Sequence, residues 1–77
     1  MDRKQVDFVD GCIAQKKPVR FKHVNGVDVL DAVPTFMSAE EVSVIVYRTH
    51  PSTPYLLKGQ KTYIAVDEVS SVELLSE

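Results

Sequence analysis

Residues 18–26 read Pro-Val-Arg-Phe-Lys-His-Val-Asn-Gly, and this stretch decides the fold. Apolar and basic residues alternate along it, which is the period of two that a half-buried β-strand shows. The alternation predicts that Val19, Phe21 and His23 share one face of a strand. Arg20 and Lys22 are then predicted to lie on the opposite face.

The strand leads directly into Asn25-Gly26, which lies between apolar residues. Asn-Gly is a strong signal for a tight hairpin, because both central residues of a type I′ turn need a positive φ. The sequence therefore predicts that the first strand turns back at Gly26 into a second strand.

The residues before this strand have a helical pattern. Asp2 is a candidate N-cap with Gln5 three residues later, and Val6, Val9 and Ile13 then recur at helical spacing. These features predict one amphipathic helix over about residues 3–15, which Pro18 ends.

Further strands are predicted after the hairpin. The second strand loses its alternation near Asp31 and Pro34, which predicts a strong bend or a bulge there. Residues 49–60 hold three Pro or Gly residues and are predicted to form a loop. The expected strands cover about residues 18–24, 27–36, 41–48, 61–66 and 69–75.

This order predicts a mainly β domain, in which an N-terminal α-helix is followed by a five-stranded, strongly bent antiparallel sheet or small open barrel of the SH3-like kind. The terminal strands would leave free edges, and free edges favour pairing with another copy. A chain of 77 residues corresponds to a single domain, residues 1–77.

The composition excludes several protein classes. Hydrophobic residues make up 44% of the chain and charged residues 26%, as in ordinary globular domains. No apolar run is long enough for a membrane span, and the charged start does not suit a signal peptide, so a cytoplasmic location without membrane partners is expected. The single cysteine, Cys12, supports neither a disulfide framework nor a metal cluster. No cofactor and no small-molecule ligand are expected.

The charge is unevenly distributed. Residues 1–26 carry six cations against three anions, and residues 27–77 carry three cations against eight anions. A solvated surface or an anionic partner would explain this basic first third. The candidate nucleic-acid contacts are its cationic side chains, Lys16, Lys17, Arg20 and Lys22. Aromatic residues stack on unpaired bases, but most of the later ones, Phe36, Tyr47, Tyr55 and Tyr63, are expected in the core of so small a barrel.

Catalytic motifs are missing from the sequence. His23 is interpreted as a strand residue, His50 as a loop residue and Cys12 as a small core residue. The pairs Glu40-Glu41 and Asp67-Glu68 fall in predicted turns, where carboxylates are common. An enzyme is not expected.

Residues 8–26, from Phe8 to Gly26, resemble the start of the bacterial Sm-like (LSm) family, the Hfq-type RNA chaperones. The shared features are an amphipathic helix with a phenylalanine, Pro-Val at the start of the first strand and Val-Asn-Gly at the first hairpin. Three later stretches are similar to the family more loosely: Thr35-Phe36, residues 42–46 and Val69-Ser70-Ser71-Val72.

This resemblance implies a helix on a bent five-stranded sheet, closed homo-oligomeric rings made by pairing of the fourth and fifth strands, and binding of single-stranded RNA. By position, Gln5 matches the glutamine that contacts uridine, Lys16 falls in the basic rim, and Phe36 matches the phenylalanine that ends the second strand. The sequence departs from the family at six positions, namely Lys22, Asp28, Asp31, Met37 and the pair Val66-Asp67, which replaces the family's Lys-His.

Two hypotheses follow. In the first, the chain is an Sm-like ring of five to seven subunits that binds single-stranded RNA as a chaperone or riboregulator. In the second, it is an Sm-like homo-oligomeric module for protein–protein interaction or structural assembly. A WYL-type regulatory domain is a further alternative, because Pro34 and the Val-Ser-Ser-Val-Glu-Leu stretch are similar to it, although the Trp-Tyr-Leu motif is missing.

Overall fold

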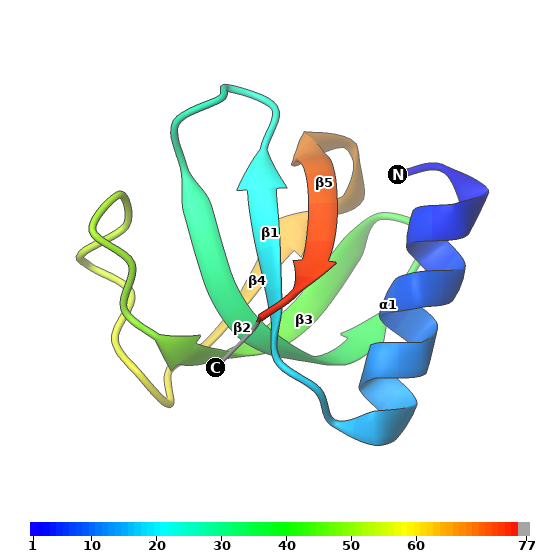
Figure 1. Ribbon diagram of the computed structural model, residues 1–77, viewed down its shortest axis with the longest axis horizontal. Helices are drawn as coiled ribbons and strands as arrows, with labels where there is room; N and C mark the ends of the chain where they lie inside the picture. The colour runs from blue at the N-terminus through cyan, green and yellow to red at the C-terminus, as the bar shows by residue number, and fades with distance from the viewer. Residues whose placement is uncertain (76–77) are drawn as a thin grey trace.

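The computed structural model describes residues 1–75 and shows one helix followed by a five-stranded antiparallel sheet (Figure 1). The strands are arranged in the order β4-β3-β2-β1-β5, so β4 and β5 form the two edges and the sheet stays open. This arrangement confirms the predicted fold class. The elements are α1 (Arg3–Gln15), β1 (Val19–His23), β2 (Val29–Met37), β3 (Glu41–Arg48), β4 (Lys61–Ala65), the 3₁₀ helix η1 (Val66–Glu68) and β5 (Val69–Leu74).

The β1–β2 hairpin differs from its prediction. His23 N–H donates to Asp28 O, so four residues connect the strands instead of two, and β2 begins at Val29 instead of residue 27. Among the residues of the turn, only Gly26 has a positive φ, which excludes a type I′ turn. The reason is local: the Asn25 side chain accepts the N–H groups of Val27 and Asp28, and this arrangement needs no left-handed asparagine.

β2 bends as predicted. Its pairing register with β3 shifts between Asp31 and Ala32 and again between Pro34 and Phe36. Such shifts are β-bulges, which bend a strand and increase its twist. Pro34 lies at the second shift, where the missing N–H is tolerated. The bend carries β2 from the hairpin to the side of the helix, as Figure 1 shows.

The core lies inside this curved sheet and is closed on one side by α1, which packs against β2 and β5. Val9 and Cys12 of the helix are buried against the sheet, and burial raises the pKa of the Cys12 thiol more than nearby Lys17 lowers it. The strands contribute alternating residues, as the period-two pattern predicts, namely Val19, Phe21, Leu30, Ala32, Val42, Val44, Val46 and Val69. Within residues 1–75, no helix is long and apolar enough to cross a membrane.

Both ends of α1 are capped. Asp2 accepts the N–H of Gln5, and the Gln5 side chain accepts the N–H of Asp2, which completes the predicted capping box. At the other end, Lys16 N–H donates to Ile13 O and Lys17 N–H donates to Cys12 O. This is the Schellman pattern, in which the residue after the helix is left-handed and usually glycine. Here that residue is Lys16, with φ of 55°.

We expect Lys16→Gly to stabilise the domain. Left-handed backbone costs a non-glycine residue about 1–2 kcal/mol, and the extra backbone freedom of glycine offsets about 0.5–1 kcal/mol of the gain. The net effect is about 0.5 kcal/mol, or roughly 2–4 °C in the thermal midpoint of so small a domain. Thermal unfolding followed by circular dichroism measures it. Lys17→Gly is the matched control, since Lys17 has a negative φ and should gain nothing. A lower midpoint for Lys16→Gly would contradict the argument.

One expectation about apolar side chains is wrong. Most of the four later aromatic residues are expected in the core, but Phe36, Tyr55 and Tyr63 are 64%, 69% and 64% exposed. Leu74 of β5 lies opposite the buried Val19 and therefore shares its inner face, yet it is 49% exposed near the end of the strand. The valines of β3 and the Phe21 ring already fill the narrow interior, so the larger side chains lie outside. This leaves aromatic surface available on a very small protein.

The predicted loop over residues 49–60 is present and is tied to the sheet. The Ser52 hydroxyl accepts the N–H of Val29, and the Thr53 hydroxyl donates to Val29 O at 2.9 Å. These two contacts satisfy the backbone at the start of β2, where β3 has already ended. Leu56 packs on the core, whereas Tyr55 and Leu57 are exposed.

Candidate functional site

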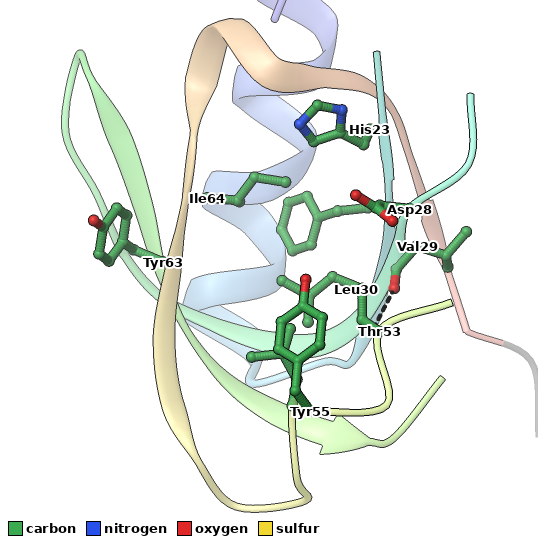
Figure 2. Close-up of a pocket in the computed structure, with 10 residues that line it drawn as sticks. His23, Asp28, Val29, Leu30, Thr53, Tyr55, Tyr63 and Ile64 are labelled. Atoms are coloured by element: carbon green, nitrogen blue, oxygen red, sulfur yellow. Dashed lines mark hydrogen bonds between the residues drawn. The ribbon is translucent and has the colours of Figure 1, made fainter. Parts of the chain in front are cut away.

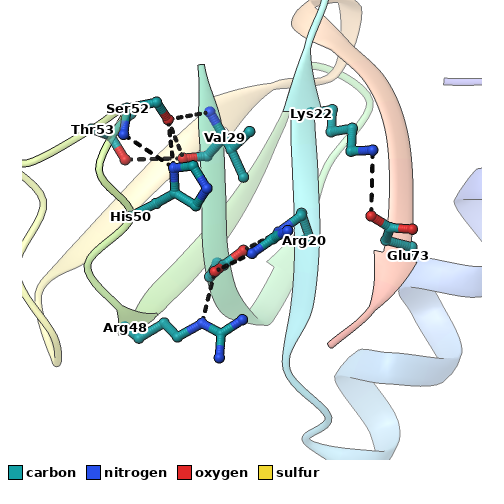
Figure 3. A network of polar contacts seen from close by, with 9 residues as sticks. Arg20, Lys22, Val29, Arg48, His50, Ser52, Thr53 and Glu73 are labelled. Carbon is teal, nitrogen blue, oxygen red and sulfur yellow. Dashed lines mark hydrogen bonds and ion pairs between the residues drawn. The ribbon is translucent and has the colours of Figure 1, made fainter. Parts of the chain in front are cut away.

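A buried carboxylate joins three strands on the outer side of the sheet. Asp31 of β2 lies opposite Arg20 of β1 and Arg48 of β3 in the strand register. Its oxygens accept hydrogen bonds from Arg20 Nε at 2.8 Å, Arg20 Nη2 at 3.0 Å and Arg48 Nε at 2.9 Å (Figure 3). Only 1% of the Asp31 side chain is exposed, because the two arginines cover it. The cluster therefore holds the bend of β2 from both sides.

The electrostatics of this cluster favour the charged forms. Burial alone would raise the pKa of Asp31, but the hydrogen bonds and charges of Arg20 and Arg48 outweigh it and lower that pKa. The hydrogen bond to Asp31 raises the pKa of Arg20. Two guanidinium groups share one carboxylate here, so one positive charge is left over.

Of the four predicted cationic contacts, the two on β1 have acidic partners. Arg20 is bound to Asp31, and Lys22 lies 3.5 Å from Glu73 of β5 in an exposed ion pair (Figure 3). Exposed pairs contribute little energy, so Lys22 can leave Glu73 at small cost, whereas Arg20 is fixed. Both residues had been predicted to be available for an anionic partner, and the strand pairing that gives them acidic partners is not visible in the sequence.

The other two cations lie together at the end of the helix. Lys16 and Lys17 are exposed, and none of the ion pairs among residues 1–75 includes either of them. The Schellman turn presents them side by side to solvent. They are the predicted contacts that remain available for an anionic ligand.

Gln5 serves the fold. Its carbonyl oxygen completes the capping box, and its Nε2 donates to Ser70 O of β5 at 3.1 Å. The side chain thus covers a backbone acceptor beside the β5 edge. A ligand that used this amide would have to replace the bond to Ser70.

Phe36 is exposed near the end of β2, on the outer face of the sheet. In the strand register it lies opposite Ser43 of β3, which in turn lies opposite Tyr63 of β4. The sequence-based site included Phe36 but missed Tyr63. The alternation of the fourth strand indicates that Tyr63 and Ile64 lie on opposite faces of the sheet. Only the strand register shows that Ser43 and Phe36 are the neighbours of Tyr63 on its face.

A small pocket opens at the hairpin end of the sheet, between β1, β2, β4 and the 49–60 loop (Figure 2). Phe21, Leu30 and Ile64 line its interior, and Tyr55 stands at its side. Its histidine and its aspartate are already engaged within the chain. His23 Nε2 contacts Glu68 at 2.9 Å, and Asp28 accepts a hydrogen bond from Asn25 at 3.0 Å. The pocket therefore offers mainly apolar surface.

The second histidine supports the loop. His50 Nδ1 accepts the N–H of Ser52 and lies 2.8 Å from the Ser52 hydroxyl, which also accepts the N–H of Val29. Because this Nδ1 accepts a hydrogen bond, neutral His50 carries its proton on Nε2. The pair joins the loop to β2. Among the described residues, no group of His, Cys, Asp and Glu is arranged to hold a metal ion.

Comparison with known proteins adds no family assignment. No family model matches the chain, and no curated protein matches it significantly.

Proposed function

We propose that this protein assembles through its sheet edges into an Sm-like homo-oligomeric ring of five to seven subunits, in which β4 of one subunit pairs with β5 of the next. The observation that carries the proposal is that each of the two edge strands has only one neighbouring strand in the described chain and an open edge on its other side, apart from Ser70 O of β5, which accepts a hydrogen bond from Gln5. Such edges favour strand addition.

The hydrogen-bond pattern identifies the free backbone groups. Val46 N–H donates to Gln60 O, and Val66 N–H donates to Glu40 O, so the even-numbered residues of β4 pair with β3. The peptide groups of Lys61, Tyr63 and Ala65 then point away from the sheet. On β5, Leu75 N–H donates to Pro18 O. By the alternation of hydrogen bonds along the strand, the backbone N–H and C=O groups of Val72 and Leu74 then point away from β1, toward the open edge.

The edges also complement each other chemically. Lys61 is the only charged residue of β4, and Glu73 is the only charged residue of β5. Tyr63 on one edge and Leu74 on the other are exposed. Antiparallel pairing places the start of β4 beside the end of β5, so Lys61 lies near Glu73. Glu73 is already paired with Lys22 of its own subunit, which leaves the Lys61 ammonium available to an anion.

We propose single-stranded RNA as the ligand of this assembly and the cytoplasm as its location. Lys16 and Lys17 would supply the cationic contacts, repeated in every subunit, so that weak phosphate contacts add through multivalency. Lys22 can join them by leaving Glu73. Gln5, Arg20 and Phe36 are the other positions that the sequence-based hypothesis assigned to RNA.

The test combines native mass with fluorescence anisotropy on six-nucleotide oligo-U and oligo-A at two salt concentrations. We expect a closed oligomer whose affinity falls with salt. Lys16→Glu/Lys17→Glu should weaken binding at least tenfold and reduce its salt dependence. The slope of log affinity against log salt concentration should become smaller by about 0.7 for each phosphate contact removed.

The matched control is Lys4→Glu/Lys58→Glu, which changes the net charge equally at two other exposed lysines. An equal loss of affinity in both double variants would indicate only bulk charge, and it would contradict a site at Lys16 and Lys17. A monomeric wild type would contradict the ring.

A second candidate is a homo-oligomeric module that binds protein partners or has a structural role. The specific observation in its favour is that Arg20 and Lys22 already have acidic partners, in addition to the Val66-Asp67 replacement. A closed oligomer that binds neither oligonucleotide would support this candidate.

A further inference from the structure

Two exposed aromatic rings flank a serine on the outer face of the sheet. Phe36, Ser43 and Tyr63 lie directly opposite one another on β2, β3 and β4. Directly opposed residues of antiparallel strands project from the same face. Both rings are 64% exposed. Figure 2 shows the Tyr63 ring on the other side of β4 from Tyr55.

The spacing of the rings suits a planar ligand. Neighbouring strands lie about 4.8 Å apart, so the backbones that carry Phe36 and Tyr63 are about 10 Å apart. A flat ring above Ser43 would lie about 5 Å from each aromatic side chain, within the roughly 4.5–7 Å range of stacked aromatic pairs. Ser43 is small enough to leave this space open. We call this space, between Phe36 and Tyr63 above Ser43, the aromatic slot.

The surroundings of the slot are polarised. The next outward row of the sheet holds Val33, Ile45 and Lys61, and a surface hollow runs from Thr35 and Ser43 to Ile45 and Lys61. Lys61 is exposed and belongs to none of the ion pairs within residues 1–75. The exposed Glu41 lies two residues from Ser43 in the opposite direction.

We infer that the aromatic slot holds one unpaired base of a single-stranded nucleic acid, with Lys61 on the adjoining phosphate. This inference rests on the proposed function, and it names a contact that Lys16 and Lys17 cannot supply. A nucleotide combines a flat base with an anionic phosphate on one side. This combination matches the rings of Phe36 and Tyr63 with Lys61 at one end of the slot. Glu41 repels phosphate, so the nucleic-acid backbone lies on the Lys61 side.

The experiment measures binding of oligo-U and oligo-A hexaribonucleotides by anisotropy and by quenching of tyrosine fluorescence. Base stacking on an aromatic side chain is sensitive to alanine substitution. We expect Tyr63→Ala and Phe36→Ala each to weaken binding about tenfold, and Tyr63→Phe to bind as the wild type does. Tyr55→Ala is the matched control, because Tyr55 is equally exposed but lies on the 49–60 loop, and it should change nothing.

The outcomes separate this inference from the proposed function. Unchanged affinity in Tyr63→Ala and Phe36→Ala, together with a loss in Lys16→Glu/Lys17→Glu, would overturn the slot and keep RNA binding. Wild type that binds neither oligonucleotide would overturn both. Quenching by a capped Gly-Trp-Gly peptide but by no oligonucleotide would assign the slot to a protein side chain and overturn the inference. Native mass is measured for each variant, to show whether assembly is intact. If Tyr63→Ala disturbs assembly at the β4 edge, Phe36→Ala still tests the slot, because Phe36 lies on the inner strand β2.

Discussion

Replacing Arg20 and Arg48 together by methionine is expected to lower the free energy of unfolding by about 3–5 kcal/mol, because it leaves Asp31 as a buried carboxylate without a cation. The side chain is 1% exposed and receives three hydrogen bonds from the two arginines. Small domains have total stabilities of about 5–15 kcal/mol, so this variant would be close to unfolding. Urea denaturation at neutral pH measures the loss.

The pH dependence should change sign in the same variant. In the wild type the arginines hold the pKa of Asp31 below its ordinary value, so the carboxylate stabilises the fold above the unfolded-state pKa. This contribution is lost as the pH falls through the lowered folded-state pKa. Without the arginines, burial alone would raise the folded-state pKa of Asp31. The variant should then gain stability on acidification, over a range in which the wild type loses it.

Single substitutions provide the control. Arg20→Met leaves Arg48 on the carboxylate, and Arg48→Met leaves Arg20, so each should cost less than half of the double change. Arg3→Met removes an exposed arginine from a weak surface pair with Asp7 and should change stability by less than about 0.5 kcal/mol. Two outcomes would show that the Asp31 carboxylate does not depend on the two arginines. The first is that the effects of the single substitutions add up to that of the double substitution, and the second is that the double variant loses stability on acidification as the wild type does.

The sequence predicted the elements of this fold well because each has a periodic pattern. Val19 and Phe21 alternate with Arg20 and Lys22, and the structure buries the first two. The bend of β2 could also be predicted, since Pro34 and the broken alternation admit no regular central strand. The turn type could not be predicted from the Asn-Gly dipeptide alone. The Asn25 side chain accepts the backbone N–H groups of Val27 and Asp28, and the preference of Asn-Gly for a type I′ turn does not take these bonds into account.

The candidate site was harder to predict because its chemistry depends on register. Asp31 was noted only as a departure from the family glycine, whereas its two arginine partners, 11 and 17 residues away, meet it through strand pairing. Pairing across strands likewise brings Tyr63 into the same row as Phe36. Counting charges along the sequence therefore overestimated the basic surface. Assigning the aromatic residues to the core underestimated the exposed aromatic surface.

The last prediction concerns the β4 edge, which Ala65→Pro should block while leaving the subunit folded. Ala65 already has φ of −68°, close to the value of about −65° that a proline ring imposes. The preceding residue is in extended conformation, as a residue before proline prefers. By the alternation of hydrogen bonds along β4, the N–H of Ala65 points away from β3, so the sheet within the subunit loses no bond.

For an incoming β5 strand the same substitution removes a donor and places the proline ring where the ladder would form. We therefore expect the native mass to fall from that of the ring to 8.6 kDa, with an unchanged circular dichroism spectrum. Ala65→Ser keeps the N–H and should assemble as the wild type does. Because weak contacts add only within a ring, RNA affinity should fall by about 10²-fold or more in the monomer, although Lys16, Lys17 and the aromatic slot are intact. Assembly of Ala65→Pro at wild-type mass would place the interface elsewhere than the β4 edge, and full RNA affinity in a monomer would show that one subunit suffices for binding.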